Sequence, residues 1–198
     1  MKINNIIISL CVALCISTGA SAKEIEKGTF EIQGDLNINN TGTDLKFKSG
    51  NELEVNSRVL SGSVGYYIFN NLGLGLRWKH EFHSTIAEDV DNEINLNEYG
   101  PILFYNLGLN QHNSLKFFGG ISRVSVKERL QFSSDVVKED ALGKGTVLGA
   151  GFSSFINEFI SLNITLSREN HSFEYDNVRD LDKQSQNIFN VGMSILIR

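Results

Sequence analysis

The chain has 198 residues, a formal net charge of −5 and only two cysteines, Cys11 and Cys15. A mildly acidic chain is a poor candidate for binding nucleic acid. Both cysteines lie in an N-terminal segment that we expect to be removed, which excludes disulfides, cysteine-ligated metals and cysteine nucleophiles from the processed protein.

Residues 1–22 have the layout of an export signal. Lys2 precedes an apolar run over residues 6–16, which is too short to cross a bilayer as a helix. Small residues follow at Ala20-Ser21-Ala22, the pattern that signal peptidase cleaves. We therefore predict a signal peptide over residues 1–22 and cleavage before Lys23, which leaves a domain of about 176 residues over 23–198.

The rest of the chain contains no apolar stretch near the roughly 20 residues that a membrane helix needs, so a membrane crossing here requires strands. Period-two alternation is the dominant pattern, and it is cleanest where Ile160, Leu162, Ile164 and Leu166 alternate with Ser161, Asn163, Thr165 and Ser167. The same alternation predicts eight strands, near residues 27–38, 53–68, 73–82, 95–106, 115–129, 146–156, 160–168 and 186–197.

The predicted connections alternate between short and long. The short ones are residues 69–72, 108–114 and 156–159, and the long ones are 39–52, 83–94, 131–145 and 169–184. In an up-and-down barrel with an even number of antiparallel strands, all short turns share one rim and all long loops share the other, as in outer-membrane barrels. The fold class that we predict is all-β, an eight-stranded antiparallel up-and-down transmembrane β-barrel.

Alternation alone leaves open which face of each strand is outside. A soluble periplasmic, lipocalin-like barrel that binds a small apolar ligand is the alternative, with its apolar face turned inward. The polar face favours the membrane barrel, because Glu31, Asp35, Arg77, Lys79 and Glu81 would pair with one another inside a narrow lumen.

Aromatic residues gather near the short turns and predict a girdle at the membrane interface. They are Tyr66, Tyr67, Phe69, Phe104, Tyr105, Phe117, Phe118, Phe155 and Phe159. Ordinary core packing is the alternative explanation for each of them.

Three segments resemble one family. Residues 65–75, GYYIFNNLGLG, resemble a strand, turn and strand of the outer-membrane β-barrel domain family, the small OmpA/OmpX-like barrels. Residues 149–158 resemble a later hairpin of that family, and residues 190–197 are similar to the C-terminal signal that the barrel assembly machinery reads. The resemblance implies a cell outer membrane location, with outer-membrane lipid, lipopolysaccharide and the assembly machinery as partners.

No residue pattern predicts catalysis, a cofactor or a metal site, so we expect no enzyme activity and no cofactor. A lipid A-modifying enzyme is a weaker alternative. Its nearest His-x-Ser string, His112-Asn113-Ser114, lies in a predicted periplasmic turn, and His80, His83 and His171 lack the required spacing. The long loops carry acidic residues, among them Glu88, Asp89, Asp91, Glu93, Glu169, Glu174, Asp176, Asp180 and Asp182. We interpret them as a solvated crown, with a divalent cation site as the alternative.

An eight-stranded barrel is filled by its own side chains, so an open diffusion pore is not expected. The sequence therefore predicts a structural, adhesion or surface-interaction protein that binds any extracellular ligand through its long loops.

Overall fold

The computed structural model describes residues 23–37, 43–46, 52–87, 90–132, 135–175 and 182–198. The described residues contain no helix that is long and apolar enough to cross a membrane. The strands are β1 (Phe30–Asn37), β2 (Thr43–Lys46), β3 (Glu52–Phe69), β4 (Leu72–Ala87), β5 (Val90–Gly108), β6 (Asn113–Phe132), β7 (Asp135–Phe155), β8 (Ile160–Tyr175) and β9 (Asp182–Ile197).

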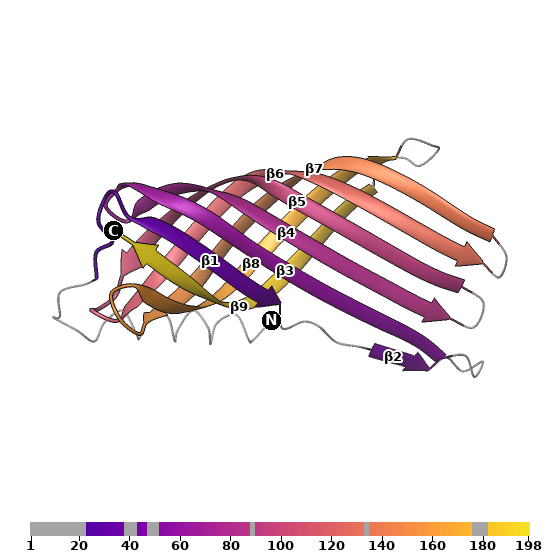
Figure 1. Cartoon of the computed structure of the whole chain (residues 1–198), viewed down its shortest axis with the longest axis horizontal. Coiled ribbons are helices and arrows are strands. Elements are labelled where there is room, and N and C mark those ends of the chain that lie inside the picture. Colours follow the sequence, from indigo (N-terminus) through magenta and orange to yellow (C-terminus); the bar gives the residue numbers. More distant parts are fainter. Residues whose placement is uncertain (1–22, 38–42, 47–51, 88–89, 133–134, 176–181) are drawn as a thin grey trace, which may run out of the picture.

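The strands form one closed antiparallel ring (Figure 1). Neighbours in sequence are paired from β3 to β9, and β1 closes the ring because Phe30 lies opposite Ile197 of β9 on one side and Tyr66 of β3 on the other. β2 pairs with the same edge of β3 as β1 does, so β1 and β2 occupy one position in the ring. The predicted eight-stranded barrel is confirmed.

Short turns lie at one end of the barrel and long hairpins at the other. The predicted short connections are confirmed between β3 and β4, β5 and β6, and β7 and β8. In the tightest of them Asn71 has a φ of 66°, a left-handed conformation that asparagine tolerates better than most residues. We refer to the two ends as the short-turn end and the long-hairpin end.

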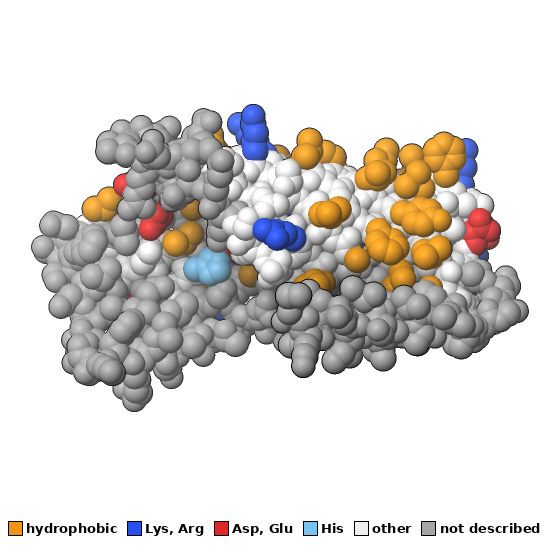
Figure 2. Space-filling view, turned by 180° about the vertical axis from the view of Figure 1, so that it is seen from behind, with side chains coloured by type: hydrophobic (Ala, Val, Ile, Leu, Met, Phe, Trp, Pro, Cys, Tyr) orange, Lys and Arg blue, Asp and Glu red, His pale blue; other side chains and the backbone are white. Residues whose placement is uncertain are grey.

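The apolar face of the strands is on the outside. Leu162, Ile164 and Leu166 of β8 are exposed, whereas the alternating residues from Ser161 to Ser167 are buried in the ring. The same holds for β4, where Leu76 is 67% exposed and Lys79 is 2% exposed. Hydrophobic side chains cover much of the outer surface toward the short-turn end (Figure 2). This apolar belt confirms the orientation predicted for a membrane barrel and contradicts a soluble barrel with an apolar lumen.

The long loops predicted at 83–94, 131–145 and 169–184 are largely wrong, because the strands continue into them, whereas most of the predicted loop 39–52 lies outside the described residues. β4 extends to Ala87 and β5 starts at Val90, so most of 83–94 is a strand pair, and 131–145 and 169–184 are likewise strand for most of their length. Past the apolar belt the outer face of the wall is no longer consistently apolar, so the alternation weakens while the backbone ladder persists. Periodicity therefore placed the ends of the strands too early.

Two apolar clusters lie inside the ring and interrupt its polar lining. The lower cluster, near the short turns, contains Ile25, Tyr67, Ile102, Phe104, Phe155 and Leu196. The upper cluster contains Leu96, Val124, Val126, Ala141 and Phe173. The core of this barrel is thus layered, with charged residues between two apolar layers.

The predicted aromatic girdle is only partly correct. Tyr66, Phe69, Tyr105, Phe117 and Phe159 are exposed on the outside, but Tyr67, Phe104, Phe118 and Phe155 point into the lumen. Glycines on the inner face make room for these rings, since a Cβ built on Gly65 or Gly73 would lie within 2.4 Å of the Phe104 ring. The inward aromatic side chains thus occupy the space that larger side chains at these glycine positions would take.

Candidate functional site

The lumen is the part of the barrel where polar and titratable side chains converge. Inward positions on β4, β5 and β8 place Arg77, Lys79, Glu81, Glu98, Glu169 and His171 together between the two apolar clusters. We call these six residues the charge network. β4 and β8 are four positions apart in the ring of eight and so face each other across the lumen.

Lys79 is at the centre of the charge network. Its ammonium Nζ lies 2.6 Å from a carboxylate oxygen of Glu81 and 3.2 Å from one of Glu98, and it also bonds with Glu169 across the lumen. Arg77 bonds with two of these three partners, Glu98 at 3.1 Å and Glu169. Each cation therefore ties β4 both to its neighbour β5 and to the opposite wall.

Two further side chains, His171 of the network and Gln186 beside it, contact these carboxylates. Nε2 of His171 lies 3.2 Å from Oε2 of Glu98, and the side-chain amide of Gln186 on β9 donates to Glu81 at 2.9 Å. Buried charged groups need such partners, because an unpaired buried charge lowers the stability of the fold by about 3–5 kcal/mol. Four strands are thereby held together by side chains as well as by backbone bonds.

A second polar crossing lies closer to the short turns. Lys116 of β6 donates to Glu31 and Gln33 of β1, both at 2.7 Å. The Tyr67 hydroxyl donates to Glu31 at 2.7 Å and accepts from Asn106 at 2.6 Å. β1 and β6 are also opposite each other in the ring, so the lumen is bridged at two levels.

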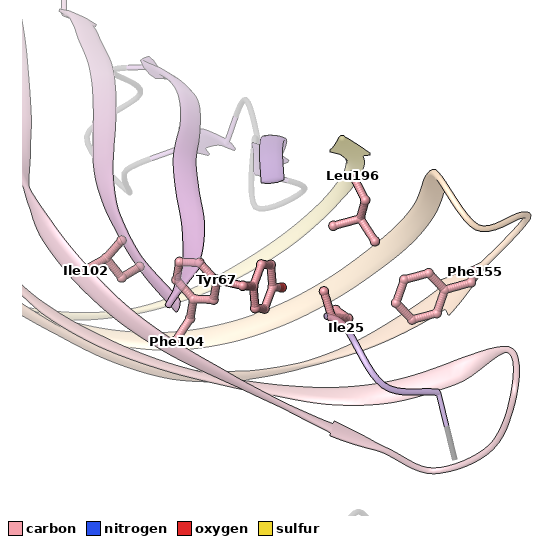
Figure 3. Packing of buried hydrophobic residues seen from close by; sticks show 6 residues of the cluster. All are labelled: Ile25, Tyr67, Ile102, Phe104, Phe155 and Leu196. Atoms are coloured by element: carbon pink, nitrogen blue, oxygen red, sulfur yellow. The ribbon is translucent and has the colours of Figure 1, made fainter. Parts of the chain in front are cut away.

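The segment before β1 closes the short-turn end of the lumen. Ile25 enters the mouth and packs among Tyr67, Phe155 and Leu196 (Figure 3). Its backbone N–H donates to the Asn71 side chain and its carbonyl accepts from the Asn71 N–H, at 2.8 and 2.9 Å. We call residues 23–29 the N-terminal strap.

Lys23 anchors the start of the strap. Its ammonium lies 4.1 Å from the centroid of the Phe155 ring, and its backbone N–H donates to the carbonyl of Asn110. Partial burial lowers the pKa of Lys23, and the nearby Arg198 guanidinium lowers it further, against an opposing effect of Glu158. The strap is thus held by hydrogen bonds, apolar packing and a cation–π contact.

Between the two polar crossings the lumen holds a cavity of only about 20 Å³. Its lining includes Gln33, Asp35, Arg77, Lys116 and Asn190. A single ordered water needs on the order of 10–15 Å³ by the same measure, so this space suits a water molecule or so and no larger solute. At this level of the lumen, side chains leave little free space.

The predicted histidine positions do not form a catalytic group. His112 is exposed in the turn after β5 while Ser114 is buried, so the His-x-Ser string does not present both side chains on one surface. His80 faces outward beside Asn97 at 2.8 Å, His83 contacts Glu81, and His171 is buried in the charge network rather than in a loop.

The predicted acidic crown needs one correction. Glu169 is fully buried in the charge network, because β8 extends past residue 168 and the side chain of Glu169 points into the lumen. Asp91 is exposed and Glu93 lies 3.8 Å from Arg129, while Glu88, Asp89, Asp176 and Asp180 fall outside the described residues. Glu174 and Asp182 are in strands whose side chains are not described at those positions.

One group has metal-like geometry. Ligand atoms of Glu98, Glu169 and His171 all lie within 4.8 Å of one another. Arg77 and Lys79 already bond with both carboxylates, so a divalent cation would have to displace two resident positive charges. The donor set fits an internal ion-pair network better than a metal centre.

Sequence reasoning found Arg77, Lys79 and Glu81 from their inward register, but missed Glu98 and His171 because only the ring geometry brings them together.

The comparisons agree on the fold. The family model described as outer membrane protein beta-barrel domain matches residues 8–195. The N-terminal β-barrel domain of Pseudomonas aeruginosa OprF superposes with a TM-score of 0.55 at 13% identity, covering 87% of this chain and 100% of that chain. Ail, the attachment invasion locus protein of Yersinia pestis, superposes with a TM-score of 0.57 at 12% identity, covering 86% and 99%. No curated protein sequence matches this chain.

Proposed function

The chain belongs to the outer membrane protein β-barrel domain family, and on that premise we propose that it is a sealed barrel of the outer membrane whose long hairpins carry a structural, adhesion or surface-interaction role. The observation that supports this proposal best is a lumen bridged by ion pairs at two levels, with a cavity of about 20 Å³, beneath hairpins that extend past the apolar belt. If no solute passes through the barrel, its function must lie on its surface, and the long hairpins are the part of the surface that a rigid barrel presents.

The absence of a diffusion pore is tested by conductance. The purified barrel reconstituted in a planar bilayer is expected to give no stable single-channel steps, because Lys79 and Lys116 hold opposite walls together. As a positive control for detection, a larger porin is reconstituted in parallel. Regular ohmic steps from the folded wild-type barrel would refute a sealed lumen.

The long hairpins are proposed to be extracellular and the short turns periplasmic, the arrangement usual for such barrels. Because both cysteines lie in residues 1–22, single cysteines can be introduced without background. Lys138→Cys, exposed in the β6–β7 hairpin, should react in intact cells with a membrane-impermeant maleimide, and Asn157→Cys, exposed in the β7–β8 turn, should react only after lysis. The reverse pattern would invert the topology.

We also propose that residues 1–22 are the signal peptide. Intact mass of the protein from outer membranes is expected to correspond to a chain that starts at Lys23. The small residues Ala20-Ser21-Ala22 directly before Lys23 support this site. A mass that retains residues 1–22 would contradict the proposal.

The surface role is tested by separating the hairpins from the barrel. In a deletion strain, attachment of cells to surfaces and survival in bile salts are measured, and the lost property is complemented with two forms of the gene. The full chain should restore it, whereas a form in which residues 84–93 are replaced by a two-residue turn should not. The name of Ail, an attachment invasion locus protein, makes attachment the first property to test. Full complementation by the shortened form would place the role outside the β4–β5 hairpin.

A catalytic role is not part of the proposal, since His80, His83 and His171 lie in three different environments. Lipid A mass spectra of the deletion strain and its parent are expected to be identical. A new acyl or headgroup species in either strain would revive the lipid A-modifying alternative.

A further inference from the structure

We propose that the lumen binds one monovalent metal cation in the cavity between the two polar crossings, with the Asp35 carboxylate and the side-chain oxygen of Asn190 as its ligands. The inference adds a bound ion to the proposed sealed lumen and rests on that part of the proposed function. It assigns no role to the hairpins or to the lipid-facing wall.

Asp35 has no ion pair with any described residue, unlike the four carboxylates of the charge network and the second polar crossing. Each of its carboxylate oxygens accepts from the side-chain amide of Gln33 at 2.9 Å. The oxygen of that amide accepts from Lys116 at 2.7 Å, which keeps the amide nitrogen turned toward Asp35. A neutral amide brings no positive charge, so the carboxylate lacks a charged partner.

The balance of charge in this part of the lumen gives the same result. Among the described residues, the charge network, the second polar crossing and the cavity between them contain five carboxylates and three cations. They are Glu31, Asp35, Glu81, Glu98 and Glu169 against Arg77, Lys79 and Lys116. A protonated His171 would balance the charge network, and Lys116 balances Glu31. The remaining negative charge is that of Asp35, and a charge removed from water needs a counter-charge.

Asn190 supplies independent evidence for a ligand. Its side chain is 5% exposed and lines the same cavity, and its Oδ1 is buried without a hydrogen-bond partner in the described part of the chain. Buried acceptors normally have a partner. Asn190 is two positions from Gly192 on β9, and Gly192 is the register partner of Asp35, so the two side chains are neighbours on the inner face. Two oxygen acceptors that face one small space favour a cation between them.

The glycine and the hydroxyl groups around the cavity make the space suitable for an ion. A Cβ on Gly192 would lie 2.1 Å from an oxygen of Asp35, so only glycine leaves room for the carboxylate there. The hydroxyl side chains of Ser63, Thr165 and Ser167 also line the cavity. Carboxylate, amide and hydroxyl oxygens are hard ligands that suit hard cations. A space of about 20 Å³ admits a bare ion and excludes a fully hydrated one.

Arg77 and Lys116 line the cavity as well, but their charges are directed at other groups. Arg77 bonds with Glu98 and Glu169 of the charge network, and Lys116 bonds with Glu31. An anion in the cavity would lie against the Asp35 carboxylate and would leave Oδ1 of Asn190 without a partner. A divalent cation would add one positive charge more than Asp35 can balance. The arrangement therefore favours a monovalent cation.

The experiment measures urea unfolding of the barrel in phosphatidylcholine vesicles, followed by the emission of Trp78, in sodium chloride or N-methylglucamine chloride at equal ionic strength. N-methylglucamine is too large for a cavity of about 20 Å³. For the wild type, the equilibrium constant for folding should rise about tenfold for each tenfold increase in sodium above its dissociation constant. Replacing sodium by N-methylglucamine should abolish this rise.

Two variants test the ligands. Asp35→Asn keeps the shape of the side chain and removes its charge, so its stability should not depend on which of the two cations is present. Asn190→Ala keeps the charge and removes one ligand, so about tenfold more sodium should be needed for the same stabilisation. Each variant is first checked for heat-dependent migration in SDS electrophoresis, which confirms folding. If D35N does not fold, N190A carries the comparison.

The matched control is D91N, the same substitution at an exposed carboxylate of β5. It removes one negative charge without touching the cavity and should show the sodium dependence of the wild type.

Two outcomes would overturn the proposal. Equal wild-type stability in the two salts would mean that the cavity holds only water or that Asp35 is protonated. An equal sodium dependence in the wild type and in D35N would mean a general salt effect. Conductance detects a pore and cysteine labelling detects topology, and neither measures an ion at Asp35, so failure here is distinguishable from failure of the proposed function.

Discussion

Replacing Lys79 by methionine tests whether the charge network holds the barrel together. Lys79 is 2% exposed and contacts the carboxylates of Glu81, Glu98 and Glu169. Methionine has similar length without charge, so the change leaves three buried carboxylates facing one full cation, Arg77. Removing one partner of a buried ion pair costs about 3–5 kcal/mol, and we expect the K79M variant to lose stability in that range.

The assay is urea unfolding of the barrel in lipid vesicles. Trp78 is the single tryptophan of the chain and lies on the outer face beside Lys79, so its emission reports whether β4 is in the membrane. K138M, which removes an exposed lysine, is the control and should change the unfolding free energy by no more than about 0.5 kcal/mol. The double variant K79M/E169Q should be more stable than K79M, because it removes one of the orphaned carboxylates.

A loss below about 1 kcal/mol for K79M, or no recovery in the double variant, would refute the reasoning. The first result would mean that water enters the lumen and solvates the carboxylates. The second would mean that Glu169 is not coupled to Lys79 across the ring.

Three further predictions concern packing inside the ring. Ile25→Ala should destabilise the barrel by about 2 kcal/mol or more in the same unfolding assay, since Ile25 is 4% exposed in the lower cluster, whereas Glu26→Ala at an exposed neighbouring position should have little effect. Tyr67→Phe should cost about 1–3 kcal/mol, because Asn106 and Glu31 lose a buried partner, and a neutral result would argue against the second polar crossing. Gly100→Ala should reduce the folded fraction in heat-modification electrophoresis, because a Cβ there would lie 2.0 Å from the carbonyl oxygen of Ile121, whereas Gly34→Ala should fold normally, with no atom within 4 Å of its Cβ.

Strand number and the outward direction of the apolar face followed from the sequence alone. Leu162, Ile164 and Leu166 alternate with polar residues at period two, and no helix competes for that pattern. The charged residues Glu31, Arg77, Lys79 and Glu81 were also placed correctly inside, because a residue's parity along a strand fixes its face.

Tertiary structure alone decided where strands end and which charges meet. A hairpin in water keeps its backbone ladder without an apolar face, so the sequence around Ala87 and Val90 carries no periodic signal for the strand that is there. Glu169 pairs with Lys79 because closure of the ring places β8 opposite β4, a relation between residues 90 positions apart that no local pattern contains. Parity is a local property of the chain, whereas the partner across a barrel is fixed only when the last strand meets the first.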